Sequence, residues 1–107
     1  MKGWKQAYTP CRRLPVLVEL DIEEDAVTKH VRQYGTTKDF YTCSRAKVVA
    51  ITSLDGLNSI SKADSMKVPG FIYEVGKEVV AQNVPGYGNS PGIYFFKTKK
   101  QALEYEF

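Results

Sequence analysis

The sequence holds few of the residues that build metal sites or disulfide frameworks. It has two cysteines, Cys11 and Cys43, and a single histidine, His30, among 107 residues. No CxxC pair accompanies them, so no familiar zinc spacing is present. Without an export signal, we expect both thiols to be reduced in a cytoplasm. The sequence therefore predicts no metal and no cofactor.

Long apolar runs and enzyme motifs are also missing. No segment approaches the roughly 18–20 apolar residues that a membrane helix needs, and the start of the chain does not resemble a signal peptide. The motifs GxSxG, GxxxxGK with Ser or Thr, and HExxH do not occur. The spacing around His30 suggests no partner that would position it as a base. We therefore name no catalytic residue and favour a binding protein over an enzyme.

Aromatic side chains, in contrast, are plentiful. The chain has seven Tyr, five Phe and one Trp, and 43% of its residues are hydrophobic against 25% charged. This is globular composition, and the length predicts a single domain over residues 1–107. So many rings exceed what one small core readily encloses, and protein interfaces are rich in them. We therefore expect a homo-oligomer, most simply a dimer.

The net charge of +3 is unevenly distributed. Residues 1–13 carry four cations and no acid, whereas residues 19–25 carry five acids. The cations form either an anion-attracting patch or a solvated surface with chance asymmetry. Because no single element concentrates positive charge, nucleic acid is a disfavoured partner.

The pattern of apolar residues predicts several short strands. Residues 14–22 alternate apolar and acidic, and residues 46–52 are apolar on both faces, which is typical of a well-covered central strand. Residues 71–75 and 77–82 read as two short strands or one bent strand, residues 92–96 as a further strand, and residues 57–69 as a loop. Residues 23–43 fit either a short helix or extended chain. Thr98 and Gln101 have the spacing of a capping box at the start of a final helix.

Together these elements predict an α+β domain. We expect a small, mostly antiparallel or mixed sheet of four to six strands with one or two helices. The C-terminal helix would pack on the sheet.

The segment 83–92 holds two prolines and three glycines, a composition that forms no regular structure. Glycines let the backbone approach a ligand closely, and exposed N–H groups can hold an anion. The alternative is a plain connection whose tyrosines cover the edge of the core. On the first interpretation we predict a ligand site that combines this segment with rings and cations from elsewhere. Its residues are Trp4, Lys5, Arg45, Lys47, Tyr87, Asn89, Ser90 and Tyr94.

The rings and the cations of this predicted site have different roles. Tyr87, Tyr94 and Trp4 would stack on a flat ring, while the three cations would hold a phosphate. Trp4 equally fits the role of an anchor for an N-terminal strand. Arg45 and Lys47 equally fit the fringe of a sheet.

Several short motifs follow one another along the chain. They are Gly-Trp-Lys at 3–5, the strand 16–22 with Glu-Glu-Asp-Ala after it, Cys-Ser-Arg-Ala-Lys-Val at 43–48, Tyr-Glu-Val-Gly-Lys-Glu-Val at 73–79, and Gly-Ile-Tyr-Phe-Phe at 92–96 with Ala102 and Tyr105 beyond. In this order they resemble an uncharacterised domain of phages and giant viruses, often found after pentapeptide repeats. The resemblance implies a viral origin and the cytoplasm of an infected host cell, but no activity.

The chain departs from that domain at two places. The domain usually has His where this chain has Tyr94, and often a Cys shortly before Gly92, where this chain has Asn89, Ser90 and Pro91. No role of that His or Cys carries over.

The motif at 92–95 with Ala102 and Tyr105 is also similar to a strand of ADP-ribosyltransferases, in which a tyrosine packs on nicotinamide. Those enzymes need an early His or Arg and a late catalytic Glu. The segment 3–5 lacks that His, and Glu104 and Glu106 fall in the predicted helix. This resemblance implies nucleotide binding rather than catalysis.

Three functions follow from these observations. The first is a non-catalytic phage protein that sequesters a small nucleotide-type immune signal of the infected cell. The second is a protein-interaction or virion accessory module that uses the same aromatics as an interface. The third, an ADP-ribosyltransferase-like enzyme, has the least support.

Overall fold

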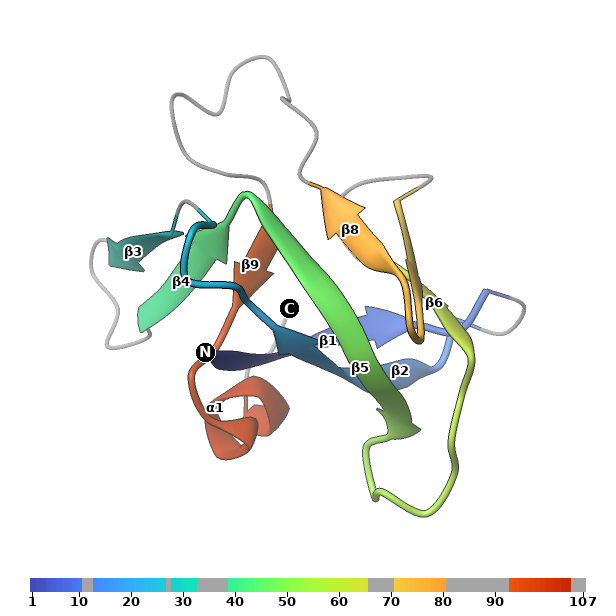
Figure 1. Ribbon diagram of the computed structural model, residues 1–107. Coiled ribbons are helices and arrows are strands. Elements are labelled where there is room, and N and C mark those ends of the chain that lie inside the picture. The colour runs from blue at the N-terminus through green and yellow to red at the C-terminus, as the bar shows by residue number, and fades with distance from the viewer. Residues whose placement is uncertain (11–12, 27, 33–38, 66–70, 81–92, 105–107) are drawn as a thin grey trace.

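A computed structural model describes residues 1–10, 13–26, 28–32, 39–65, 71–80 and 93–104 (Figure 1). Nine strands and one helix run along these residues. They are β1 (Lys2–Tyr8), β2 (Pro15–Asp21), β3 (Thr28–Arg32), β4 (Asp39–Cys43), β5 (Arg45–Ser53), β6 (Lys62–Asp64), β7 (Ile72–Glu74), β8 (Glu78–Val80), β9 (Ile93–Phe95) and α1 (Lys99–Glu104).

The strands form two antiparallel sheets. The larger sheet has the order β7-β6-β1-β2-β5-β8, and the smaller has the order β3-β4-β9. The expected antiparallel sheet and C-terminal helix are confirmed, but the expected α+β class is not clearly met, because the described residues hold one helix of six residues. In the part of the chain described here, no helix has the length and apolar character that crossing a membrane would need.

The larger sheet curls back on itself. Its two edge strands, β7 and β8, are consecutive in the chain and joined by a turn at Val75–Lys77, where Gly76 has a φ of +85°. Backbone hydrogen bonds tie this turn to both neighbours, from Gly76 to Val48 on β5 and from Val75 to Ser61 just before β6. The inner face of the curled sheet is thereby enclosed.

A bulge in β5 explains why its sequence has apolar residues at positions that a regular strand would place on both faces. The register with β2 shifts between Glu19 and Leu20, so that Val49 is the extra residue. Val48 and Ile51 therefore both face the core, although they are three residues apart. Lys47 and Val49 are exposed, so the prediction of a covered central strand is wrong for the outer face.

The main core lies inside this curl, with Val18, Leu20, Ile51 and Tyr73 almost completely buried. The smaller sheet contacts the larger one through the end of β9. Trp4 and Phe96 exchange two backbone hydrogen bonds, of 2.9 and 2.7 Å, which joins the end of β9 to β1 (Figure 1). This contact directs Phe95 into the main core.

The helix α1 covers the other side of β1. The Thr98 hydroxyl accepts a hydrogen bond from the Gln101 N–H at 3.2 Å, as the capping-box spacing predicts. The buried Gln6 side chain donates to the Ala102 carbonyl at 2.8 Å and so satisfies a group at the end of the helix. Ala102 and Phe96 belong to a second, smaller core between α1 and the sheets.

Two segments differ from their sequence predictions. Residues 28–32 and 39–43 form β3 and β4, so the helix considered for 23–43 is wrong. Both segments contain Thr, Val or aromatic residues, which suit strands, and they are paired with each other. The local pattern alone does not reveal this pairing. Residues 62–64, expected in a loop, form the short strand β6 between β1 and β7.

The close contact between β1 and Phe95 generates a stability prediction. A Cβ at Gly3 would lie 2.4 Å from Cδ2 of Phe95 and 3.0 Å from Cδ1 of Ile22. We expect Gly3→Ala to lower the free energy of unfolding by about 1–3 kcal/mol, because the buried ring must move. Chemical denaturation measures this change. Lys2→Ala, at the exposed neighbouring position, should change stability by less than about 0.5 kcal/mol. Equal effects of both substitutions would contradict the packing.

Candidate functional site

The most unusual group in the interior is the ammonium of Lys5. This side chain is 1% exposed and lies among the strands rather than in solvent. Its Nζ donates a hydrogen bond to the Tyr73 hydroxyl, and it lies 4.5 Å from the ring centroid of Tyr73 and 3.9 Å from that of Tyr94. Aromatic faces attract a desolvated cation strongly, so the two tyrosines offset part of the cost of its burial. We call Lys5, Tyr73 and Tyr94 the lysine–tyrosine cluster.

Cys43 borders the lysine–tyrosine cluster. Its thiol is free and completely buried. Burial raises the pKa of Cys43 to about 12, and the nearby charge of Lys5 and a backbone hydrogen bond at Arg45 only partly oppose this effect. Burial, with Tyr94 and Cys43 nearby, also raises the pKa of Tyr73 well above its usual range. At neutral pH both groups are protonated, so Cys43 is a poor nucleophile.

Both flanks of segment 81–92 are anchored beside this cluster. Val80, at the end of β8, pairs with Arg45, and Ile93, at the start of β9, pairs with Cys43. The two pairing partners are only two residues apart on the chain. One end of the molecule therefore holds the start of β5, both flanks of the glycine-rich segment and, in the interior, the ammonium of Lys5.

Arg45 carries the surface charge at this end. Its guanidinium lies 3.5 Å from the Glu23 carboxylate and also forms an ion pair with Asp25. Both carboxylates are mostly exposed, whereas the Arg45 side chain is half-buried. The acidic turn after β2 thereby places two carboxylates against the guanidinium.

The other residues of the predicted site are spread over several places. Trp4 points to the opposite side of β1 from Lys5 and packs on the smaller core beside α1. Lys47 is exposed on β5, opposite Asp21 and Glu78 in the register. Three of the predicted residues lie outside the described part of the chain: Tyr87, Asn89 and Ser90.

The sequence analysis missed a row of rings on the smaller sheet. The centroids of His30 and Tyr41 are 4.7 Å apart, and those of Tyr41 and Phe95 are 5.8 Å apart. The Nζ of Lys97 lies 4.3 Å from the Tyr41 centroid. The three rings come from β3, β4 and β9, whose pairing no local pattern reveals, and Lys97 follows β9. We call His30, Tyr41, Phe95 and Lys97 the ring row.

These groups are suited to binding. A buried cation and a half-buried guanidinium attract anions, and rings accept a flat ligand or a further cation. Among the residues that the structure describes, no three His, Cys, Asp or Glu side chains lie together as a potential metal site.

The fold and its charged interior define a small, mostly antiparallel β-protein in which one strand carries a buried cation. A family model matches residues 1–102, and the chain belongs to this family, which is described as a family of unknown function (DUF5758). Searches among curated proteins and among solved structures gave no match.

The raised pKa of Cys43 predicts how stability depends on pH. The unfolded thiol loses its proton near its ordinary pKa of 9.0, whereas the folded thiol keeps it to about 12. The unfolded chain then binds fewer protons between these values, so the free energy of unfolding falls as the pH rises from 9 to 12. Urea denaturation of Cys43→Ala should show a fall shallower by up to about 1.4 kcal/mol per pH unit. An unchanged pH dependence would show that this thiol is not shielded.

Proposed function

We propose that this is a viral, non-catalytic binding protein that holds a small anionic, nucleotide-type ligand. The site is the end of the molecule where segment 81–92 joins the two sheets. The observation that carries the proposal is the convergence at this end: Arg45 pairs with Val80, and Ile93 pairs with Cys43 beside the buried Lys5. The predicted site needs these strand ends to lie together, because its residues come from both of them.

The charges at this end favour a phosphate-bearing ligand. Arg45 can make two parallel hydrogen bonds to a phosphate, a geometry that a lysine cannot reproduce. Lys5 adds a positive field from the interior, where the charge is weakly screened. The sequence of segment 81–92 supplies glycine backbone groups and the ring of Tyr87 for the rest of the ligand.

The biological role that fits such a protein is sequestration. The resemblance to phage and giant-virus domains supports a viral origin and action in the cytoplasm of an infected cell. A binding protein without turnover would lower the free concentration of a nucleotide immune signal. This role needs tight binding and no chemical step.

A thermal-shift screen with cyclic nucleotides and ADP-ribose derivatives, followed by calorimetry, tests the proposal. Ligand at 100 times its dissociation constant should stabilise the fold by about 2.7 kcal/mol. No shift across the panel would contradict ligand binding, and consumption of NAD would favour the ADP-ribosyltransferase-like alternative.

The ion pairs of Arg45 provide a sharper prediction. Arg45→Ala should weaken binding of a phosphate ligand by about 1.5–3 kcal/mol in calorimetry, because a charged hydrogen bond is lost. The double variant Glu23→Gln, Asp25→Asn should instead strengthen binding, since it releases the guanidinium and removes two competing negative charges. Lys62→Ala, on the far strand β6, is the matched control. Weaker binding by the double variant would exclude Arg45 as a phosphate ligand.

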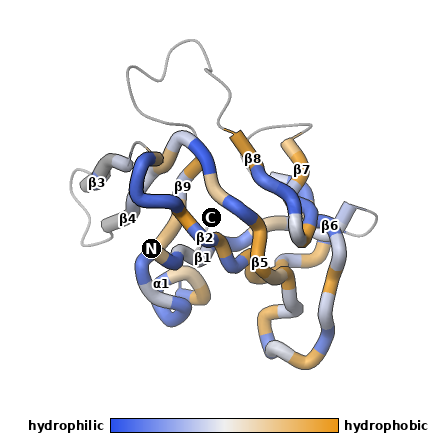
Figure 2. Tube along the Cα trace, in the orientation of Figure 1, coloured by the Kyte–Doolittle hydropathy of each residue, from blue (hydrophilic) through white to orange (hydrophobic). Residues whose placement is uncertain are grey.

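A second candidate function is association with a protein, including a second copy of this chain. Ile72 and Val80, at the ends of β7 and β8, are 52% and 59% exposed, and the tip of β8 is strongly hydrophobic in Figure 2. Exposed apolar groups at strand ends favour an interface over a solvated surface.

Light scattering tests this candidate. If the protein is a dimer held by these side chains, Val80→Lys should convert it to a 12 kDa species at high micromolar concentration. Glu78→Lys, two residues earlier on the same strand, controls for the change in charge. A 12 kDa wild-type protein would contradict self-association.

A further inference from the structure

A buried hydroxyl in the smaller sheet makes no hydrogen bond. In the described part of the chain, the buried polar or charged residues are Lys5, Gln6 and Thr42. Lys5 donates to the Tyr73 hydroxyl, and Gln6 donates to the Ala102 carbonyl. Thr42 is 7% exposed, yet its hydroxyl has no hydrogen-bond partner among the residues that the structure describes. Burying such a group costs free energy unless something bonds to it.

The strand that carries Thr42 does not need a hydroxyl there. Thr42 lies within β4, between Lys29 of β3 and Tyr94 of β9 in the register. These ladders are formed by the backbone, and valine suits a strand as well as threonine does. Valine has a similar shape and would bury no polar atom. The fold alone therefore does not explain the hydroxyl.

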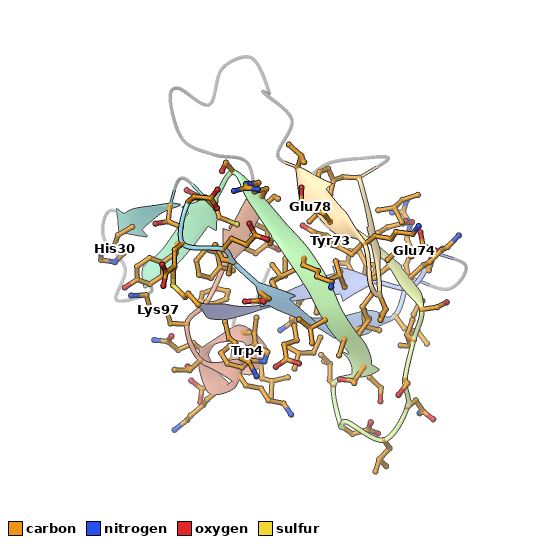
Figure 3. The ribbon with its side chains drawn as sticks, viewed as in Figure 1. Trp4, His30, Tyr73, Glu74, Glu78 and Lys97 are labelled. Atoms are coloured by element: carbon orange, nitrogen blue, oxygen red, sulfur yellow. The ribbon has the colours of Figure 1, made fainter. Side chains whose placement is uncertain are left out.

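The hydroxyl lies near the buried charge. Thr42 and Tyr94 are opposite each other on β4 and β9, so their side chains share one face, with Cβ atoms about 4.5–5.5 Å apart. The ammonium of Lys5 lies 3.9 Å from the centroid of the Tyr94 ring. Tyr73, the other ring beside this ammonium, lies among the strands of the larger sheet in Figure 3. A hydroxyl and a cation thus border the same tyrosine where the two sheets meet.

Charges of both signs surround this place. Lys5 is the buried cation, and Arg45, at the start of β5, is the cation nearer the surface. The acidic turn at residues 23–25 is exposed, and Arg45 forms ion pairs with its first and third carboxylates. Solvent screens the acids, whereas the charge of Lys5 acts through the interior, where screening is weak. The interior beside Thr42 therefore favours an anionic hydrogen-bond acceptor.

We propose that the Thr42 hydroxyl donates a hydrogen bond to a phosphate oxygen of the bound ligand. This inference rests on the proposed function and deepens it, because it assigns a direct contact to a residue that no sequence pattern singled out. Hydrogen bonds to an ionised acceptor are stronger than those between neutral groups, and burial strengthens them further. The hydroxyl is closed to solvent in the structure, so the phosphate reaches it through a local opening of the fold.

One substitution should have opposite effects with and without an anion. Thr42→Val removes the hydroxyl and keeps the shape of the side chain. In a phosphate-free buffer it should raise the urea midpoint of unfolding, because no buried hydroxyl is left unbonded. Inorganic phosphate should stabilise the wild type, and it should stabilise Thr42→Val less because a donor to the anion is gone.

Urea denaturation over a series of inorganic phosphate concentrations, at an ionic strength held constant with sodium chloride, measures both effects at equilibrium. We expect Thr42→Val to bind phosphate about tenfold more weakly, the scale of one hydrogen bond to a charged group. Thr42→Ser keeps a hydroxyl and should keep most of the affinity. Thr52→Val, a matched substitution on the half-buried Thr52 of β5, should leave the affinity unchanged.

Arg45→Ala, measured in the same series, separates this inference from the proposed function. If Arg45→Ala weakens phosphate binding and Thr42→Val does not, the inference is wrong and the proposed function stands. If Thr42→Val lowers the urea midpoint without phosphate, the hydroxyl is bonded within the fold or to a buried water, and the inference is again wrong. If phosphate does not stabilise the wild type, the inference and the phosphate site of the proposed function are both wrong.

Discussion

The structure depends on the pair of backbone hydrogen bonds between Trp4 and Phe96. They connect β9, the inner edge of the three-stranded sheet, to β1, a central strand of the curled sheet. The chain also joins the sheets directly where β4 continues into β5 through Ser44, at the other side of the smaller sheet from this contact. With the two hydrogen bonds, Phe95 is fixed above Gly3, and Tyr94 is placed where the ammonium of Lys5 meets its ring. Three adjacent residues of β1 therefore have different roles. Gly3 leaves room for the ring of Phe95, Trp4 joins the two sheets, and Lys5 carries the buried charge.

The buried charge is the exceptional consequence of this arrangement. Alternation along β1 directs Gly3, Lys5 and Ala7 into the core, so Lys5 occupies a position where an apolar residue would ordinarily be more stable. The faces of Tyr73 and Tyr94 and the Tyr73 hydroxyl reduce the cost of desolvation. Buried ionisable groups held this way are commoner at functional sites than in purely structural cores.

Sequence patterns predicted the elements whose signal is local. Residues 14–22 alternate regularly and form β2, and Thr98 caps α1 through its own side chain. The three residues of β6 are too few to show a period, and β3 and β4 depend on pairing with each other and with β9. Of the residues predicted for the site, the structure brings Lys5 and Tyr94 into contact and places Arg45 two residues from Cys43, which lies beside Lys5. The sequence could not show that Lys5 is buried or that Trp4 faces the other way, because both depend on which sheet covers β1.

The ion pairs of Arg45 illustrate how exposure decides what a charged group can do. Glu23 and Asp25 are 60% and 74% exposed, and ion pairs in that setting contribute about 0–1 kcal/mol each. Such contacts are too weak to withhold the guanidinium from a phosphate, although the two carboxylates compete with it for the same cation. On the proposed function, a phosphate would displace these weak pairs, and it would bind more tightly where the competing carboxylates are neutral. Lys5 differs because it is buried: its contacts cannot be exchanged without opening the core, so on the proposed function its charge would act on a ligand through the field rather than by direct contact.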